Sequence, residues 1–264
     1  MGAFKQTDVA GLFYSDNPAE LEVQIDNFLT TGCNHGDRPQ IIVAPHAGYI
    51  YSGPIAGSAY STLVHLKNQI ETVVVLSPAH RYYVEGIATH SGDGFLTPFG
   101  PLEIDDSLRK HLISKFKEIQ ILDQAFEMEH GLEVHLPFIW KVFGPHVKII
   151  PLVVGQSDFK LISSLLDDLI SKSNVYPIIS SDLSHFHPYE TACRIDKKTS
   201  EIIEECSYEK LHPDFACGYF SLRGLLDYAR RFGLKARTLD LRNSGDTAGD
   251  KSRVVGYGAF GFYK

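Results

Sequence analysis

The sequence predicts an α/β fold in which a mostly parallel sheet lies between two layers of helices. Short, β-branched runs that are apolar throughout recur along the chain, and segments with helical periodicity separate them. Strands without polar alternation are typical of a parallel sheet that helices cover on both faces. No linker rich in Pro, Gly or Ser divides the 264 residues, so we expect residues 1–264 to form a single domain.

The predicted elements alternate along the chain. Strands are expected at residues 40–44, 72–76, 147–154, 175–180 and 254–262. Helices are expected at residues 54–66, 132–142, 159–171, 191–205 and 221–231. Pro54 would open the first of these helices, because an N–H is not needed in a helix's first turn. The Gly- and Pro-rich residues 87–103 predict an inserted hairpin.

Composition excludes several classes of protein. The chain carries 25 Lys and Arg against 32 Asp and Glu, a net charge of −7, whereas nucleic-acid and anionic-membrane binders rely on basic surfaces. No apolar run reaches the length of about 20 residues that a membrane span needs, and the N-terminus does not resemble a secretory signal. Cys33, Cys193, Cys206 and Cys217 form no C-x-x-C pair. We therefore expect a reduced, cytoplasmic protein without nucleic-acid or membrane partners.

Histidines follow three of the predicted strands. His46 and His80 follow the first two strands, and His185 follows the fourth, with Asp182 three residues before it. The carboxyl ends of parallel strands form the ligand crevice of an α/β sheet, so these side chains are expected to converge there. Imidazole is both a common metal ligand and a general base near pH 7. The sequence therefore predicts a metal or acid/base site at this edge.

Two metals fit such a site. Two histidines and one carboxylate bind Fe(II) in enzymes that activate O₂. The same ligands would make a hydrolytic zinc site with metal-bound water. The residues alone leave this choice open.

The segment 129–137 adds a fourth candidate element. Glu133 lies three residues after His130, on the same face of a predicted helix. We favour a His130–Glu133 pair that orients the site, with helix stabilisation by Glu133 as the alternative. Cys217 is either a reactive thiol near a helix start or a small buried side chain, and we favour the second interpretation. No nucleotide-binding glycine loop or serine nucleophile elbow occurs.

Five segments resemble the MEMO family, the relatives of the animal mediator of ErbB2-driven cell motility. They are PHAGYIYSG (45–53), LSPAH (76–80), EHGLEVHLPF (129–138), SSDLSHF (180–186) and NSGDTAGDKSRVVGYGAF (243–260). The resemblance covers about residues 38–262. It implies a fold similar to the class III extradiol (LigB-type) dioxygenases, with a metal at the strand ends.

The resemblance also implies roles for individual residues. His46 and His80 match the family's ligating histidines, while Asp182 and His185 match residues that line the same pocket. His185 falls where the dioxygenases place an acid/base histidine. The third ligand of the animal members is a cysteine in the segment equivalent to 243–250, which has no cysteine here. We therefore expect Asp246 to complete a two-histidine, one-carboxylate site.

These observations favour a metal-dependent, non-haem oxidoreductase of dioxygenase-like type that acts on a small aromatic or polar molecule. Fe(II) is the expected metal, with copper and zinc as alternatives. His185, Asp182, His130 and Glu133 are the expected catalytic residues. A peptide- or phosphopeptide-binding module is an alternative function, although no Arg cluster marks a phosphate site. A metal-dependent hydrolase is another.

Overall fold

Residues 3–31 and 38–264, which the computed structural model describes, contain a central sheet of nine strands. Its strand order is β10-β12-β2-β9-β3-β8-β4-β7, and β11 also pairs with β12. Its strands are β2 (Ile41–Ala44), β3 (Thr72–Pro78), β4 (Ile87–Thr89), β7 (Ile119–Ile121), β8 (Lys148–Val154), β9 (Val175–Ser180), β10 (His185–His187), β11 (Lys235–Asn243) and β12 (Val254–Tyr263).

The predicted apolar strands form the middle of this sheet. β2, β9, β3 and β8 lie side by side and run parallel, and β2, β3 and β9 are buried along their whole length. All five predicted strands are confirmed, because a strand covered on both faces has few polar positions. Their carboxyl ends lie at one edge of the sheet, where His46, His80 and Asp182 follow them.

The whole sheet is mixed, so the prediction of a mostly parallel sheet is wrong. β12 runs antiparallel to β2, β10 and β11, and β4 runs antiparallel to β8. β11 and β12 form a long hairpin that is added to the β2 edge. The sequence analysis missed β11 because its side chains are largely half-exposed and polar, as is typical of an edge strand.

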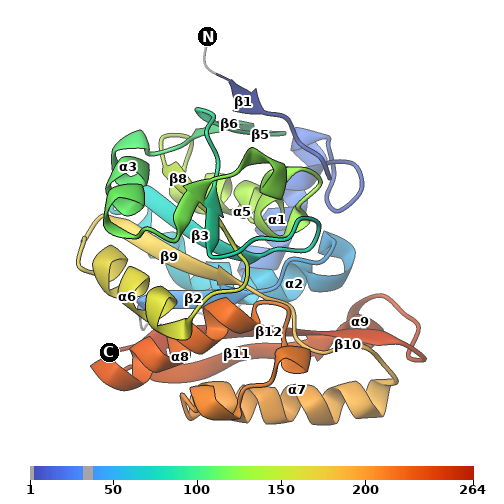
Figure 1. Ribbon diagram of the computed structural model, residues 1–264. Coiled ribbons are helices and arrows are strands. Elements are labelled where there is room, and N and C mark those ends of the chain that lie inside the picture. Colours follow the sequence, from blue (N-terminus) through green and yellow to red (C-terminus); the bar gives the residue numbers. More distant parts are fainter. Residues whose placement is uncertain (1–2, 32–37) are drawn as a thin grey trace.

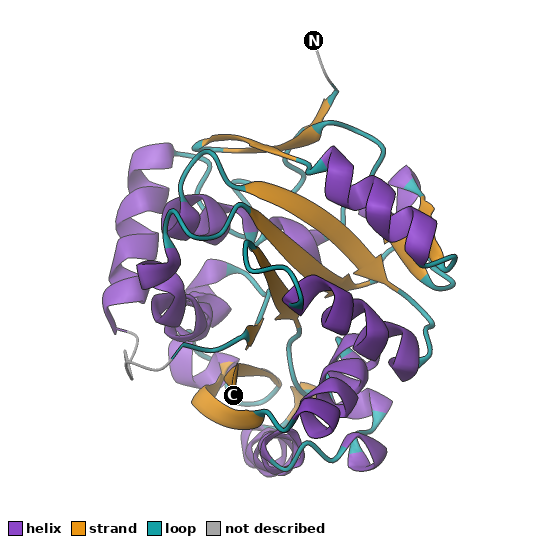
Figure 2. Ribbon diagram, turned by 90° about the vertical axis from the view of Figure 1, so that its left-hand side faces the viewer, coloured by secondary structure: helices purple, strands orange, loops and turns teal. Residues whose placement is uncertain are grey.

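Helices cover both faces of the sheet (Figures 1 and 2). α6 and α8 pack on one face, α1, α2 and α5 on the other, and α7 packs against β11 and β12. The helices are α1 (Pro18–Thr31), α2 (Tyr49–Tyr60), α3 (Asp106–Lys115), α4 (His130–Glu133), α5 (Leu136–Phe143), α6 (Phe159–Ile170), α7 (Tyr189–Glu204), α8 (Tyr219–Phe232) and α9 (Ser244–Thr247), with a 3-10 helix at Ser61–Leu66.

Most predicted helices are present with shifted ends. The predicted helix at 132–142 is divided into α4 and α5, and α1 and α3 were not predicted. The predicted hairpin is formed by β5 (Gly94–Thr97) and β6 (Gly100–Glu103), which β1 (Phe4–Lys5) joins in a small separate sheet. Across the described ranges, no helix is long and apolar enough to cross a membrane. Cys193, Cys206 and Cys217 are free thiols, and Cys33 lies outside the described residues.

α2 begins at Tyr49, five residues before the predicted start at Pro54. Pro54 therefore lies inside the helix, where it lacks the N–H that would bond the Ile50 carbonyl. Ile50 is exposed in the first turn, so water reaches that end of the helix. The earlier start places the helix directly after His46, with Gly48 as its N-cap.

Two glycines of α2 allow α1 to approach closely. A Cβ atom at Gly57 would lie 2.5 Å from the backbone oxygen of Phe28, and a Cβ at Gly53 would overlap the Phe28 ring. Both glycines face α1 because they are four residues apart on one helix face. The contact fixes the position of α2 and thereby of the segment that contains His46.

We expect Gly57→Ala to destabilise the protein by about 1–3 kcal/mol, the usual cost of an overpacked contact. The added methyl group meets backbone atoms of α1, which have no alternative rotamer. Urea unfolding followed by circular dichroism measures the change. Gly48→Ala is the control for a methyl group added without a clash, because the nearest atom to its Cβ would be at an ordinary 3.5 Å, and its expected loss is the smaller cost of alanine at an N-cap, under about 1 kcal/mol. Equal stability of the two variants would contradict this account of the α1–α2 contact.

Candidate metal centre

His46, His80 and His130 form a compact group at the carboxyl edge of the sheet. Each offers a ring nitrogen, and these nitrogens lie within 4.8 Å of one another. The ring centroids of His46 and His80 are 5.0 Å apart, and those of His80 and His130 are 4.5 Å apart. His46 follows β2, His80 follows β3, and His130 opens α4. This spacing suits three imidazole ligands of one metal ion.

Glu129 fixes the orientation of His80. Its carboxylate accepts hydrogen bonds from His80 Nδ1 at 2.7 Å, His80 N at 2.6 Å and Gly131 N at 2.9 Å. Burial would raise the pKa of Glu129, but these hydrogen bonds and the nearby His80 hold it below its usual value. Since Nδ1 of His80 donates to an ionised carboxylate, Nε2 carries the lone pair that a metal needs.

The hydroxyl of Ser180 fixes the orientation of His46 in the same way. Ser180 donates to the Gly131 carbonyl at 2.6 Å, so its oxygen accepts from both His46 Nδ1 at 2.6 Å and His135 Nε2 at 2.8 Å. His135 Nδ1 in turn accepts from the Tyr60 hydroxyl at 2.9 Å. A hydroxyl has one proton to donate, so this pattern assigns the proton of His46 to Nδ1 and leaves Nε2 as an acceptor.

Cys217 lies against this free nitrogen. Its Sγ is 3.4 Å from His46 Nε2 and accepts a hydrogen bond from Asp182 N at 3.2 Å. Burial, and then the charge of Asp182, raise the pKa of the Cys217 thiol, so the metal-free protein keeps the S–H, which has both the Asp182 carbonyl and His46 Nε2 within reach. The favoured sequence interpretation, a small buried side chain, did not predict this contact of Cys217 with His46.

Asp182 positions the backbone that carries His46. Its Oδ1 accepts the His46 N–H at 2.8 Å, and the carboxyl group is buried. Burial raises the pKa of Asp182 to about 7, against the opposing effect of backbone N–H groups from His46 and Ala47. Asp182 therefore borders the cluster, as predicted, but its carboxyl is bonded to backbone.

His185 lies near the three histidines without belonging to their group. It opens β10, and it lies close enough that a proton on its ring would lower the pKa values of His46 and His130. The register with β12 shifts between His185 and His187, and Phe186 has a φ of 62°. Burial lowers the pKa of His185, and the charge of His80 adds to this effect, so the ring is neutral near pH 7. Its acid/base role stays a prediction.

Asp246 is not brought into the cluster. Its Oδ2 accepts the Asn243 N–H at 2.9 Å in a capping box of α9, and its Oδ1 accepts from the Tyr189 hydroxyl at 2.7 Å. A carboxylate at the third position of a helix is suited to this capping role. The expected two-histidine, one-carboxylate arrangement is therefore replaced by three imidazoles, with His130 in the third place.

The predicted His130–Glu133 pair does not form. Glu133 accepts hydrogen bonds from Asp8 N, Val9 N and the Tyr14 hydroxyl at 2.8–2.9 Å, so it anchors the N-terminal segment. His130 instead stacks on His80. The sequence did not assign four residues to the site that the structure places there: Glu129, Ser180, His135 and Cys217. All but Cys217 lie inside the motifs it had singled out.

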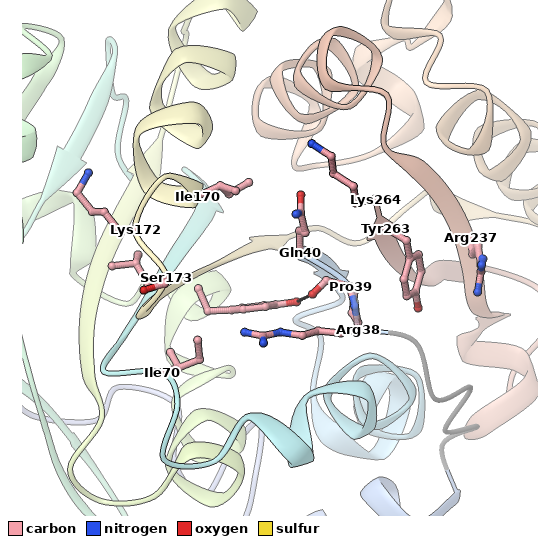
Figure 3. A pocket seen from close by; sticks show the side chains of 12 residues that line it. Arg38, Pro39, Gln40, Ile70, Ile170, Lys172, Ser173, Arg237, Tyr263 and Lys264 are labelled. Atoms are coloured by element: carbon pink, nitrogen blue, oxygen red, sulfur yellow. Dashed lines mark hydrogen bonds between the residues drawn. The ribbon is translucent and has the colours of Figure 1, made fainter.

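Cavities lie at both ends of the parallel strands. One of about 290 Å³ adjoins the cluster and includes Cys217 in its wall. Another lies at the amino ends of β2 and β9 and is lined by four cationic side chains (Figure 3): Arg38, Lys172, Arg237 and Lys264. Their charged groups point in different directions, and Lys172 is bonded to Asp168. We therefore assign the candidate site to the carboxyl edge.

Comparisons with known proteins identify the same family over nearly the whole chain. The family model described as Memo-like protein matches residues 5–260. A MEMO1 family protein of Desulfurococcus amylolyticus is 33% identical over 276 residues, covering 97% of each chain. Another, from Sulfolobus acidocaldarius, is 32% identical over 272 residues, covering 94% of this chain and 95% of the relative.

A solved structure supports the fold alone. The uncharacterized protein JW3007 of Escherichia coli K12 aligns with a TM-score of 0.53 and 12% sequence identity, covering 82% of this chain and 98% of that one. The family match and the archaeal relatives are far more specific. The chain belongs to the Memo-like protein family.

Proposed function

We propose that this protein binds a divalent transition metal through His46, His80 and His130 and uses it in oxidation–reduction chemistry on a small molecule. The observation that carries the proposal is the group of three ring nitrogens within 4.8 Å of one another. The expected substrate is a small molecule, and we propose Fe(II) as the metal, with copper as the closest alternative.

The residues present fit such an ion. Hydrogen bonds direct the Nε2 lone pairs of His46 and His80 away from Ser180 and Glu129, which hold the opposite nitrogens. In the described part of the chain, the buried Nδ1 of His130 has no hydrogen-bond partner. Burial, and then the charge of His80, lower the pKa of His130 to about 4, so this ring is a neutral donor at physiological pH. Imidazoles beside a thiol suit iron, copper or zinc better than magnesium or calcium.

The side chains around the three histidines have different proposed roles. When bound, an iron or copper ion supplies a site for O₂ and a change of oxidation state. Cys217 offers a sulfur donor at His46, and Asp182 holds the backbone at His46. His185 is neutral near pH 7 and half-buried beside the cluster, so it is suited to accept a substrate proton.

One observation favours a second candidate function. Three histidines without a carboxylate are also the ligands of some catalytic zinc sites, in which metal-bound water performs hydrolysis. Metal analysis of protein purified anaerobically, followed by oxygen-consumption assays with catechols and thiols, separates the two. Iron or copper with oxygen consumption supports the oxidoreductase. Zinc alone, with hydrolysis and no oxygen consumption, would favour the hydrolase.

Single substitutions should identify the ligands. We expect His46→Ala, His80→Ala and His130→Ala each to weaken Zn(II) or Fe(II) binding by more than about 100-fold, beyond the effect typical of outer hydrogen-bond partners. Asp246→Ala and His185→Ala should change affinity less than about threefold, because neither belongs to the three-nitrogen group. Titration calorimetry measures the affinities. A loss in Asp246→Ala as large as that in His46→Ala would refute this ligand set.

Removing the Ser180 hydroxyl should weaken metal binding without removing a ligand. Ser180→Ala leaves the Nδ1–H of His46 without its acceptor, so the ring is free to change tautomer and rotamer. We expect affinity to fall by about 10–100-fold, the usual effect of losing such a partner.

Ser77→Ala is the matched control for that variant. Ser77 is a buried serine near the end of neighbouring β3, and its hydroxyl donates to the Leu152 carbonyl at 3.5 Å. Its loss should leave metal affinity unchanged. If both serine variants bound metal as tightly as the original protein, the role of Ser180 in orienting His46 would be disproved.

The buried histidines make the metal-free fold sensitive to acid. Burial lowers the pKa of His135 to about 3, whereas the unfolded chain binds this proton near 6.5. Between these values the unfolded state binds more protons, so stability falls as pH falls, by about 1.4 kcal/mol per pH unit for one histidine. Asp182 acts oppositely, because its raised pKa favours proton uptake by the folded state.

Comparing the original protein with His135→Gln isolates the contribution of His135 to the pH dependence of stability. From pH 6 to 5, the free energy of unfolding of His135→Gln should fall less steeply than that of the original protein. The two slopes should differ by about 1.4 kcal/mol per pH unit, since Asp182 contributes equally to both proteins. Urea unfolding at several pH values, in chelator, measures these slopes. Parallel slopes would show that His135 already takes up its proton in the folded state.

A further inference from the structure

We propose that the 290 Å³ cavity beside the histidines binds an uncharged aromatic ring of the substrate. We call it the aromatic cavity and define it by Tyr82, Tyr83, Val154, Gln156, Cys217 and Phe220. The proposal extends the proposed function, and it rests on that function for the statement that the ligand of this cavity is a substrate.

Three of the ten lining residues are aromatic, and they come from two segments that also contribute to the proposed metal centre. Tyr82 and Tyr83 follow His80 by two and three residues, and Phe220 lies in the first turn of α8, three residues after Cys217. Tyr83 is 72% exposed and Tyr82 is 45% exposed, so both side chains have surface that a ligand in the cavity can cover. Because Tyr82, Tyr83 and Phe220 line one cavity together, they form an apolar patch rather than scattered single side chains, and such patches suit ligand binding.

The chemistry of the walls excludes a charged ligand group. Within the described chain, no Asp, Glu, Lys, Arg or His lines the aromatic cavity. The polar atoms there include the Gln156 amide, whose Oε1 accepts from the Tyr83 hydroxyl at 3.3 Å. Charged residues line the adjoining cavity instead, namely Glu85, Asp158 and Arg223. The two cavities share Gln156 and Phe220. An uncharged ring therefore matches this compartment, whereas a phosphate or carboxylate does not.

The size of the cavity suits one aromatic ring, and any further part of the ligand would extend through its open side. An engineered protein cavity of about 150 Å³ holds benzene, so about 290 Å³ admits a single ring with small substituents. Aromatic walls favour a planar ring over a saturated one of similar volume, because edge-to-face and offset contacts add about 0.5–1.5 kcal/mol each beyond buried area.

The backbone at the base of the cavity is fixed before any ligand binds. Gly155 N donates to the Gly86 carbonyl at 3.0 Å, and Gln156 N donates to the Val84 carbonyl at 2.9 Å. A Cβ at Gly155 would overlap the Val84 carbonyl, so only glycine permits this approach of β8 to the segment after Tyr83. A preformed cavity binds its ligand without first ordering the chain.

Cys217 joins the cavity to the metal centre. Its side chain lines the cavity, and its Sγ lies 3.4 Å from His46 Nε2. A ring in the cavity therefore lies next to the nitrogen that we assign to the metal. This adjacency makes the cavity a binding place for the reacting part of a substrate.

Binding of 4-fluorophenol, followed by ¹⁹F NMR, tests the proposal in chelator-treated protein. Phenol should displace the probe, whereas cyclohexanol and benzoate should be weaker competitors by at least about threefold, because one lacks the aromatic face and the other carries charge. Tyr83→Ala and Phe220→Leu should each weaken binding by about three- to tenfold. Tyr83 is largely exposed, so its variant keeps the test valid even where Phe220→Leu perturbs folding.

Phe232→Ala is the matched control, because Phe232 lies in the same helix as Phe220 but outside the aromatic cavity. It should bind the probe like the original protein. Equal probe affinity in the original protein and Tyr83→Ala, or equal competition by cyclohexanol and phenol, would overturn the proposal.

A paramagnetic ion tests adjacency to the metal centre. Co(II)-loaded protein should relax the bound ¹⁹F nucleus faster than Zn(II)-loaded protein does, and equal relaxation would overturn the placement of the ring. Metal content is measured on the same samples. Probe binding without any metal affinity would support the cavity and remove the proposed function, whereas metal affinity without probe binding would overturn the cavity alone.

Discussion

The hydroxyl of Ser180 joins three separate parts of the chain inside the protein. It accepts from His46 after β2 and from His135 before α5, and it donates to the Gly131 carbonyl in α4. Each partner is a polar group removed from water, so each needs this bond to avoid a desolvation cost of about 1–3 kcal/mol. The arrangement of the three-histidine group depends on this junction, because it fixes His46 and the helix that contains His130.

Two further features show that the site is held in position by its surroundings. Met128 has a φ of 54° immediately before Glu129, and Phe186 has a φ of 62° immediately after His185. Residues other than glycine adopt such angles at a cost, and they persist where neighbouring contacts determine them. Here the neighbouring contacts are the Glu129–His80 hydrogen bonds and the pairing of β10 with β12. Both strained residues thus present histidines to one edge of the sheet.

The sequence predicted the parts of the structure that depend on local patterns. Continuous apolar runs located β2, β3, β8, β9 and β12, and strand ends located His46 and His80. The prediction from sequence failed where contacts between distant segments of the chain determine the position of a side chain. Asp246 matched a carboxylate ligand by position, yet helix capping uses both of its oxygens. The local pattern could not decide between a reactive thiol and a buried side chain for Cys217, because only packing of α8 against the sheet brings its thiol to His46.

X-ray absorption spectroscopy of the metal-loaded protein tests the central claim most directly. With Zn(II) bound, we expect scattering from three imidazole rings with nitrogens at about 2.0–2.1 Å, and a sulfur at about 2.3 Å if Cys217 gives up its proton. Cys217→Ser should remove the sulfur contribution and keep the three imidazoles. A spectrum described by oxygen ligands, without the outer-shell features of imidazole, would contradict the assignment of His46, His80 and His130 as the metal centre.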